Sequence, residues 1–163
     1  MSSAKHGVKI ERVGTESAEV VFALVLALLR ELGEEAGDLG PLDRERVLAS
    51  WREGEDGYRV LLARDADGAA IGLLTLTASF AIYANGSYGM IDEMWVAPEW
   101  RGRGLGRDLL NAAKALGHEL GWSRIDVTAP ESERWARTRA FYEREGFSFA
   151  GPKLKCQLRA GAP

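Results

Sequence analysis

The chain has 163 residues, which is enough for one well-buried core and short for two domains. Apolar residues make up 46% and charged residues 28%, as is ordinary for a soluble globular domain, and the net charge of −3 argues against general nucleic-acid binding. One cysteine excludes an internal disulfide framework, and two scattered histidines make no metal cluster.

The N-terminus has no apolar region typical of a secretion signal, and the apolar run Val20–Leu29 is too short to span a bilayer. We therefore expect a cytoplasmic protein that binds neither membrane nor nucleic acid. Residues 8–158 are expected to form one domain, with a disordered tail at 1–7 and a second tail at 159–163.

The first elements are a strand and a long helix. Apolar and polar residues alternate over Val8–Val13, which predicts a half-buried strand. Thr15 or Ser17 can cap the helix that follows, Ala18–Leu32, and Gly33 can stop it.

A short helix and a hairpin come next. Asp43 precedes a helix from Arg44 to about Arg52. Tyr58–Arg64 and Ala69–Ala81 are predicted to be paired strands, because Asp65-Ala66-Asp67-Gly68 between them is typical of a hairpin turn.

The second half alternates between strands and helices. Tyr83–Gly89 is predicted to be a second hairpin loop because it contains Asn-Gly, and Met90–Val96 is the strand after it. A helix from Arg107 to about Leu120, a strand at Arg124–Ala129 and a helix at Glu131–Glu145 follow.

The last predicted element, Phe147–Leu158, is a strand or strand pair, and Gly146 closes the helix before it. The order β-α-α-β-β-β-α-β-α-β predicts an α/β fold of the α+β type. It would be one domain with a mixed, mostly antiparallel sheet and helices on both faces.

A glycine-rich turn between a strand and a helix is the strongest functional signal. Gly102, Gly104 and Gly106 allow positive φ and a close approach of the backbone to a ligand. The helix start adds unpaired N–H groups and arginines add charge, which predicts a phosphate site. No Gly-Lys-Ser/Thr ends the loop, so it is not Walker A, and the even spacing is not the dinucleotide Gly-x-Gly-x-x-Gly.

The turn resembles the Arg/Gln-x-x-Gly-x-Gly/Ala signature of the GNAT superfamily of acyl-CoA-dependent N-acyltransferases, with Arg101, Gly104 and Gly106 on the signature positions. The segment Ala140–Phe147 resembles that family's Phe/Leu-Tyr-x-x-x-Gly-Phe ending. The predicted element order also matches, so the resemblance covers Val8–Leu158.

The resemblance implies that acetyl-CoA binds with its pyrophosphate on the amides of this turn and its pantetheine arm along the preceding strand. Trp135 and Thr138 depart from the family pattern, which often has Asn and Ala at these positions. The residues expected to hold the coenzyme are Met94, Trp95, Val96, Arg101, Gly102, Arg103, Gly104, Leu105, Gly106 and Arg107.

Acyl transfer to an amine needs a base for the amine and an acid for the leaving thiolate. Asp92 and Glu93 are adjacent on the central strand, and because strand neighbours point to opposite faces, at most one should face a given cleft. Glu93 has the longer reach, whereas Asp92 has the better register if the cleft lies on the side of Met94. The resemblance implies that Tyr142 is the general acid, and a phenol is protonated at neutral pH.

Acidic residues gather at the end of the first helix, where they would attract a cationic amine. Together with the acids of the central strand they resemble the diamine and polyamine acetyltransferase branch. The residues expected to contact the acceptor are Glu31, Glu34, Glu35, Tyr83 and Tyr88.

The sequence thus predicts an acetyl-CoA-dependent N-acetyltransferase that moves an acetyl group to a primary amine of a small molecule by direct attack on the thioester. No Cys or Ser stands in an activated setting, so no covalent enzyme intermediate is expected. The alternatives are a non-catalytic acyl-CoA-binding or regulatory module, or an acetyltransferase for a protein amine or an aminoglycoside. A homodimer is implied by the family.

Overall fold

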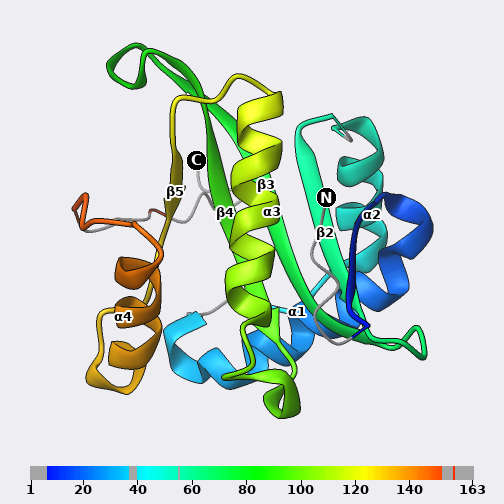
Figure 1. Cartoon of the computed structure of the whole chain (residues 1–163). Helices are drawn as coiled ribbons and strands as arrows, with labels where there is room; N and C mark the ends of the chain where they lie inside the picture. The colour runs from blue at the N-terminus through cyan, green and yellow to red at the C-terminus, as the bar shows by residue number, and fades with distance from the viewer. Residues whose placement is uncertain (1–6, 37–39, 55, 152–155, 157–163) are drawn as a thin grey trace. The chain divides into compact units, whose positions relative to one another are not determined.

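Five strands form one sheet in the order β1-β2-β3-β4-β5 in the computed structural model, which describes residues 7–36, 40–54, 56–151 and 156. All neighbouring strands run antiparallel except β4 and β5, which are parallel (Figure 1). The predicted mixed, mostly antiparallel sheet is confirmed. The strands are β1 (Lys9–Val13), β2 (Tyr58–Arg64), β3 (Ala70–Ala81), β4 (Gly86–Val96) and β5 (Ile125–Val127).

The chain divides into two compact parts, residues 1–127 and 128–163. Among the described residues, the first part contains the sheet and three α-helices, and the second contains one α-helix. The α-helices are α1 (Ala18–Leu32), α2 (Arg44–Glu53), α3 (Leu105–Glu119) and α4 (Ala136–Arg144). None of the helices that the structure describes is both long and apolar enough to cross a bilayer.

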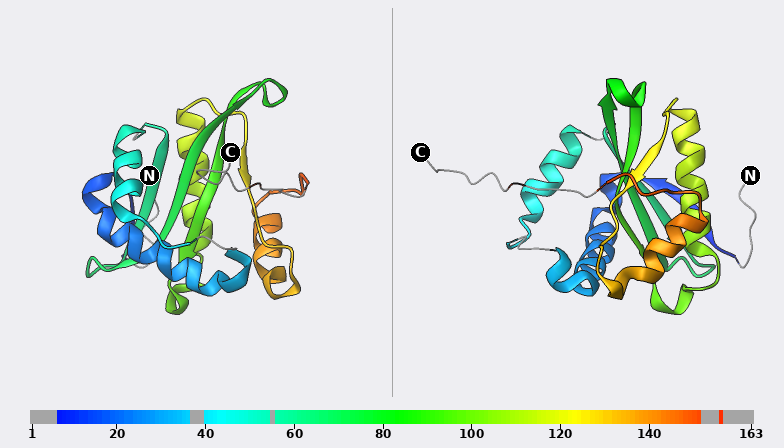
Figure 2. Two further views of the ribbon diagram at one scale, coloured as in Figure 1. Left: turned by 180° about the vertical axis from the view of Figure 1, so that it is seen from behind. Right: turned by 90° about the vertical axis from the view of Figure 1, so that its left-hand side faces the viewer.

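Helices α1 and α3 cover opposite faces of the sheet (Figure 2). Leu105 and Leu109 of α3 lie so close to Gly72 of β3 that a Cβ on this glycine would meet them at 3.5 and 3.3 Å. The next residue, Leu73, points the other way and belongs to the core beneath α1. That core consists of Ala18, Val21, Phe22, Leu24, Trp51, Val60, Leu62 and Leu73.

Most of the capping and turn residues lie in the structures that the sequence predicts. Asp43 caps α2, because its side chain accepts a hydrogen bond of 3.0 Å from the Arg46 amide. Asn85 has a φ of 59° in the turn that joins β3 to β4, and Gly68 has a φ of 85° in the turn before β3. Gly33 ends α1 with a φ of 56°.

The predicted side-chain cap of α1 is wrong. Ser17 occupies the N-cap position but makes no capping hydrogen bond with its side chain. A 3-10 turn, Thr15–Ser17, leads into the helix instead, and the Glu16 carboxylate accepts from the Gly14 amide at 2.8 Å.

The ends of three other elements differ from the prediction. β4 begins at Gly86 rather than Met90, because its first residues continue the ladder with Ala78–Ala81 of β3 up to the turn. α3 begins at Leu105, two residues early, and β5 keeps only Ile125–Val127 of the predicted strand.

In the second part, α4 follows a 3-10 turn at Glu133–Trp135, and Gly146 ends it with a φ of 95°. The predicted last strand is absent from Phe147–Gly151, where the structure describes no regular element. The remainder of that prediction, apart from Cys156, lies outside the described residues, as do the predicted tails apart from Gly7.

Candidate active site

A β-bulge in the middle of β4 shapes the predicted acidic pair. On β3 the pairing advances by two residues, from Leu74 to Leu76, while on β4 it advances by three, from Met94 to Ile91. The extra residue turns neighbouring side chains of the bulged strand away from strict alternation.

Both acids of the bulge therefore reach the same side of the sheet. Thr77 donates a hydrogen bond of 2.8 Å to the Asp92 carboxylate, and Thr75 donates one to the Glu93 carboxylate. Thr75 and Thr77 are two residues apart in β3, so their side chains share a face, which is the face beneath α1. The prediction that only one of the two acids faces a given side is wrong, because it assumed a regular strand.

Glu93 is the more enclosed of the two acids. Its side chain is half-buried, and its Oε2 accepts a second hydrogen bond of 3.0 Å from the Tyr58 hydroxyl of β2. Asp92 is exposed. Two hydroxyl groups from two other strands, those of Tyr58 and Thr75, thus hold the Glu93 carboxylate. We call this arrangement the Glu93 cage.

Burial raises the pKa of Glu93 above its ordinary value of 4.5, and the neighbouring Asp92 charge raises it further, against the opposing effect of the Thr75 and Tyr58 hydroxyls. Burial likewise raises the pKa of Tyr58, with the Glu93 charge as the second cause, so this phenol stays protonated and acts as a donor. A carboxylate whose pKa is raised above its ordinary value is better matched to accept a proton from an amine than an unperturbed one.

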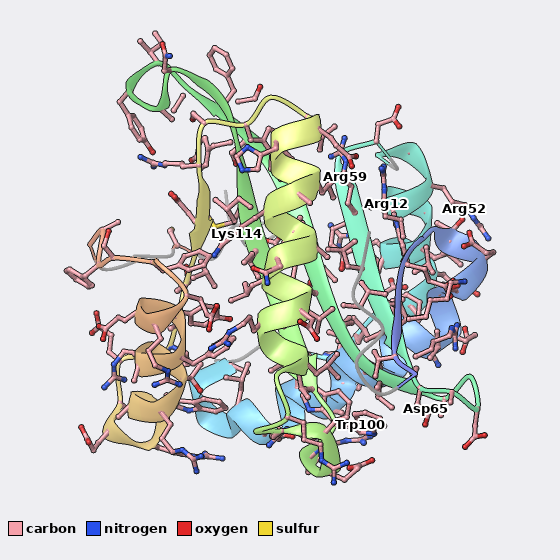
Figure 3. The ribbon with its side chains drawn as sticks, in the orientation of Figure 1. Arg12, Arg52, Arg59, Asp65, Trp100 and Lys114 are labelled. Carbon is pink, nitrogen blue, oxygen red and sulfur yellow. The ribbon has the colours of Figure 1, made fainter. Side chains whose placement is uncertain are left out.

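The glycine turn connects β4 to α3 and has the backbone that the sequence predicts. Gly102 has a φ of 72° and Gly104 a φ of 91°, and open space surrounds the position of a Cβ at both. The first hydrogen bond of the helix runs from the Asp108 amide to the Gly104 carbonyl, at 3.0 Å. The amides of Leu105 and Gly106 come before this bond, among the first amides of the helix, which have no carbonyl partner within it. Figure 3 shows Trp100 at this end of α3.

Arg101 joins the turn to α1 and β4. Its Nε donates to the Val96 carbonyl at 2.8 Å, and its Nη2 donates to Glu31 at 2.7 Å. The Trp95 indole donates to the same Glu31 oxygen at 2.9 Å. The Glu31 carboxylate, predicted to attract the acceptor, therefore holds the end of α1 against the turn.

β5 pairs with only part of one edge of β4. β5 pairs with β4 only from Gly89 to Ile91, whereas β4 continues along β3 to Val96. The predicted contacts of the pantetheine arm, Met94 to Val96, lie on this stretch, which no other described strand of the sheet covers. An edge of this kind can hydrogen-bond an extended ligand.

Tyr142 lies in the second part of the chain, on α4. Its side chain is 8% exposed and its ring lies 5.4 Å from that of Phe141 and 5.5 Å from that of Phe147. Burial raises the pKa of this phenol to about 12, so it carries its proton at neutral pH.

The residues predicted to contact the acceptor occupy different places. Tyr88 shares the α1 face of β4 with the two acids, about four residues along the strand, which corresponds to roughly 13 Å. Tyr83 belongs to the exposed hairpin end, and Arg124 stacks 5.0 Å from both tyrosine rings. The side chains of Glu34 and Glu35 lie outside the described part of the structure.

Tyr58 and Thr75 are site residues that the sequence analysis missed. A signal for Thr75 exists, because two threonines interrupt the apolar run Ile71-Gly72-Leu73-Leu74-Thr75-Leu76-Thr77. Among the residues that the structure describes, Thr75 is the one buried side chain that is neither apolar nor aromatic. Buried hydroxyls need partners, and two adjacent acids on the neighbouring strand could supply them.

Comparison with known proteins identifies the family. Residues 56–149 match the model of the acetyltransferase (GNAT) domain. An IAA acetyltransferase from Azospirillum brasilense is 31% identical over 129 residues, covering 78% of this chain and 79% of the relative. An aminoalkylphosphonate N-acetyltransferase from Salmonella typhimurium is 27% identical over 140 residues, 85% of this chain and 84% of that protein.

Solved structures share the fold. An aminoglycoside acetyltransferase from an uncultured soil metagenomic sample superposes with a TM-score of 0.77 at 18% identity, covering 96% of this chain and 100% of that one. A ribosomal-protein-alanine N-acetyltransferase from Brucella melitensis gives a TM-score of 0.73 at 18% identity, with coverage of 94% and 100%. At this identity the likeness concerns the fold alone.

The chain therefore belongs to the GNAT acetyltransferase family. It is an N-acetyltransferase, and acetyl-CoA is its acetyl donor. The turn fits that donor, because its positive-φ glycines leave open space and the start of α3 offers amides to phosphate oxygens.

Proposed function

We propose that the protein acetylates a primary amine of a small molecule, and that the amine attacks the acetyl group directly. The observation that carries this proposal is the position of Glu93, a half-buried carboxylate with a raised pKa next to the exposed Asp92 on one face of the sheet. At pH 7 only about one in 2500 molecules of an amine with a pKa near 10.4 is neutral, so a base that removes the proton of the ammonium group is needed.

The two acids receive different roles in this proposal. Glu93 accepts the proton that the ammonium group loses, directly or through water, because its raised pKa matches it better to this transfer. Asp92 is exposed, and its carboxylate would attract the cationic acceptor. This assignment is our proposal for the choice that the sequence left open.

Acetyl-CoA supplies an activated acetyl thioester, and we assign its phosphates to the turn at Arg101–Arg107. The main-chain amides at the start of α3 and the positive end of its dipole would hold them. Arg103 and Arg107 are exposed and add positive charge there.

Tyr142 is proposed to supply the proton that a leaving thiolate needs. The support is the family motif around it and a pKa of about 12, which keeps the phenol protonated. Tyr142 and Glu93 would thus act as acid and base respectively.

The acceptor class is a proposal too. The acids at the end of α1 and in the bulge support a diamine or polyamine. An aminoalkylphosphonate and an aminoglycoside are named for relatives of this chain, and both are small molecules with amines. Because a ribosomal-protein-alanine N-acetyltransferase shares the fold, a protein amine is the main alternative acceptor.

An acetylation assay against an amine panel tests the function, with release of free coenzyme A as the readout. The panel contains a diamine, a polyamine, an aminoalkylphosphonate, an aminoglycoside and a peptide with an N-terminal alanine. We expect turnover with the diamine or polyamine. Turnover with the peptide alone would overturn the small-molecule assignment. Coenzyme A binding without turnover of any of these amines would overturn the proposed acceptor classes.

The homodimer, which the family resemblance supports, and the cytoplasmic location, which the sequence analysis favours, are further proposals. Size-exclusion chromatography with light scattering tests the dimer, for which we expect twice the chain mass of 17.8 kDa. A monomer at assay concentration would contradict it.

A further inference from the structure

We infer that Tyr58 and Thr75 are positioning residues that fix the direction of the Glu93 carboxylate and control its affinity for a proton. The inference deepens the proposed function and rests on it for the catalytic meaning of Glu93. The contacts that carry it lie within one part of the chain, on strands β2, β3 and β4.

The hydrogen bonds of Thr75 direct its single hydroxyl proton toward Glu93. Its Oγ1 accepts a hydrogen bond of 3.0 Å from the backbone amide of Glu93, and the same oxygen lies in hydrogen-bond contact with Glu93 Oε2. Since a carboxylate oxygen accepts and a hydroxyl has one proton, that proton points at Oε2. Thr75 is 0% exposed, so water does not compete for it.

Tyr58 supplies the second donor to the same oxygen, at 3.0 Å. Its ring is held in place by Trp51 of α2, in an edge-to-face contact with centroids 5.3 Å apart. Trp51 is 6% exposed and belongs to the core beneath α1. Packing therefore fixes the phenol before any substrate binds.

Both donors converge on Oε2, and among the described residues none donates to Oε1. One oxygen is thus held by the fold while the other can take a proton from the acceptor amine. The transfer is balanced, because the ammonium loses one proton and Oε1 gains it without any change of oxidation state.

Among the described residues, few charged groups act on Glu93. Asp92 on its own strand opposes its ionisation, and the Tyr58 phenol on β2 remains neutral. β3 presents the hydroxyls of Thr75 and Thr77. At the end of α1, Glu31 is bonded to Trp95 and Arg101. Removal of one hydroxyl donor should therefore be visible in the titration of Glu93.

The test follows the Glu93 carboxyl carbon by NMR in protein labelled with ¹³C-glutamate, with the signal assigned by its loss in Glu93→Gln. Tyr58→Phe and Thr75→Val should each raise the pKa of Glu93 by about one unit, because hydrogen bonds to a charged acceptor favour the charged form. Thr75→Ser keeps the hydroxyl and should restore the original value.

Thr77→Val is the matched control. It removes the same chemical group two residues along the same strand, but its hydroxyl serves Asp92. An unchanged Glu93 titration in both Tyr58→Phe and Thr75→Val would overturn the inference, and so would an equal shift in Thr77→Val. Tyr58→Phe keeps the test decisive if Thr75→Val fails to fold.

The pH profile of kcat/KM with the best amine of the panel links the inference to catalysis. In Tyr58→Phe the acidic limb should move up by about one pH unit, so kcat/KM falls about tenfold below that limb and recovers at high pH. A shifted NMR titration with an unmoved pH profile would support the positioning and overturn the role of Glu93 as base. The NMR titration gives its answer even if no amine of the panel is a substrate.

Discussion

The two halves of the candidate site are built from different materials. The turn at Arg101–Gly106 is a main-chain structure, in which positive-φ glycines and the amides of a helix start would meet phosphates. The Glu93 cage is a side-chain structure assembled from three strands. Most side-chain changes that keep the backbone of the turn should therefore leave its function intact. At the Glu93 cage, by contrast, the loss of a single polar atom should disturb the carboxylate.

The largest expected effect comes from Glu93→Gln. The variant keeps the shape of the side chain but cannot accept the proton, so kcat/KM should fall about 10²–10⁴-fold, the contribution typical of a general base. Coenzyme A affinity, measured by calorimetry, should be unchanged. Full activity would remove Glu93 from the mechanism.

The stability of that variant has a defined sign. The folded-state pKa of Glu93 lies above its ordinary value of 4.5, so its contribution to folding is fully present below that pH and is lost as the pH rises through the folded pKa. Glu93→Gln should therefore keep or raise Tm at pH 8, measured by calorimetry. A strongly lowered Tm would indicate a structural role for the carboxylate instead.

Tyr142→Phe extends the comparison to the second part of the chain. The ring stays in its packing between Phe141 and Phe147, but the proton for the thiolate is lost. We expect turnover to fall by about 10²-fold, the lower end of general acid–base effects, with coenzyme A still bound. Undiminished turnover in steady-state assays would assign Tyr142 to packing alone.

Gly104→Val tests the main-chain half. A branched side chain at a φ of 91° costs about 1–2 kcal/mol and reshapes the turn, so coenzyme A affinity should fall by at least about tenfold. The matched control is Gly68→Val, because Gly68 has a φ of 85° and open space around it in the β2–β3 hairpin. A similar loss of affinity in both variants would mean that strain, not the site, is responsible.

The smallest effect is expected for Glu31→Gln. The Glu31 and Arg101 side chains are 34% and 46% exposed, and ion pairs of this kind contribute about 0–1 kcal/mol. Coenzyme A affinity should change by less than about fivefold. A KM for the amine that rises alone would instead identify Glu31 as an acceptor contact, as the sequence predicted.

Local signals predicted much of the fold. The caps and turns at Asp43, Asn85-Gly86 and Gly146 depend on residues close in sequence, and the structure has them where the sequence placed them. The limits of β4 and β5 were predicted less well, because a strand ends where its partner ends.

The sequence by itself determined the family and the glycine turn, because a turn between a strand and a helix depends on backbone freedom that glycine carries in its own chemistry. Only the tertiary structure decided which side the two acids face and what surrounds Glu93. A bulge arises from the register of β4 against β3, and the hydroxyls of Tyr58 and Thr75 come from positions 35 and 18 residues away. Contacts between distant strands, and the burial that raises the pKa of Glu93, exist only once the sheet has formed.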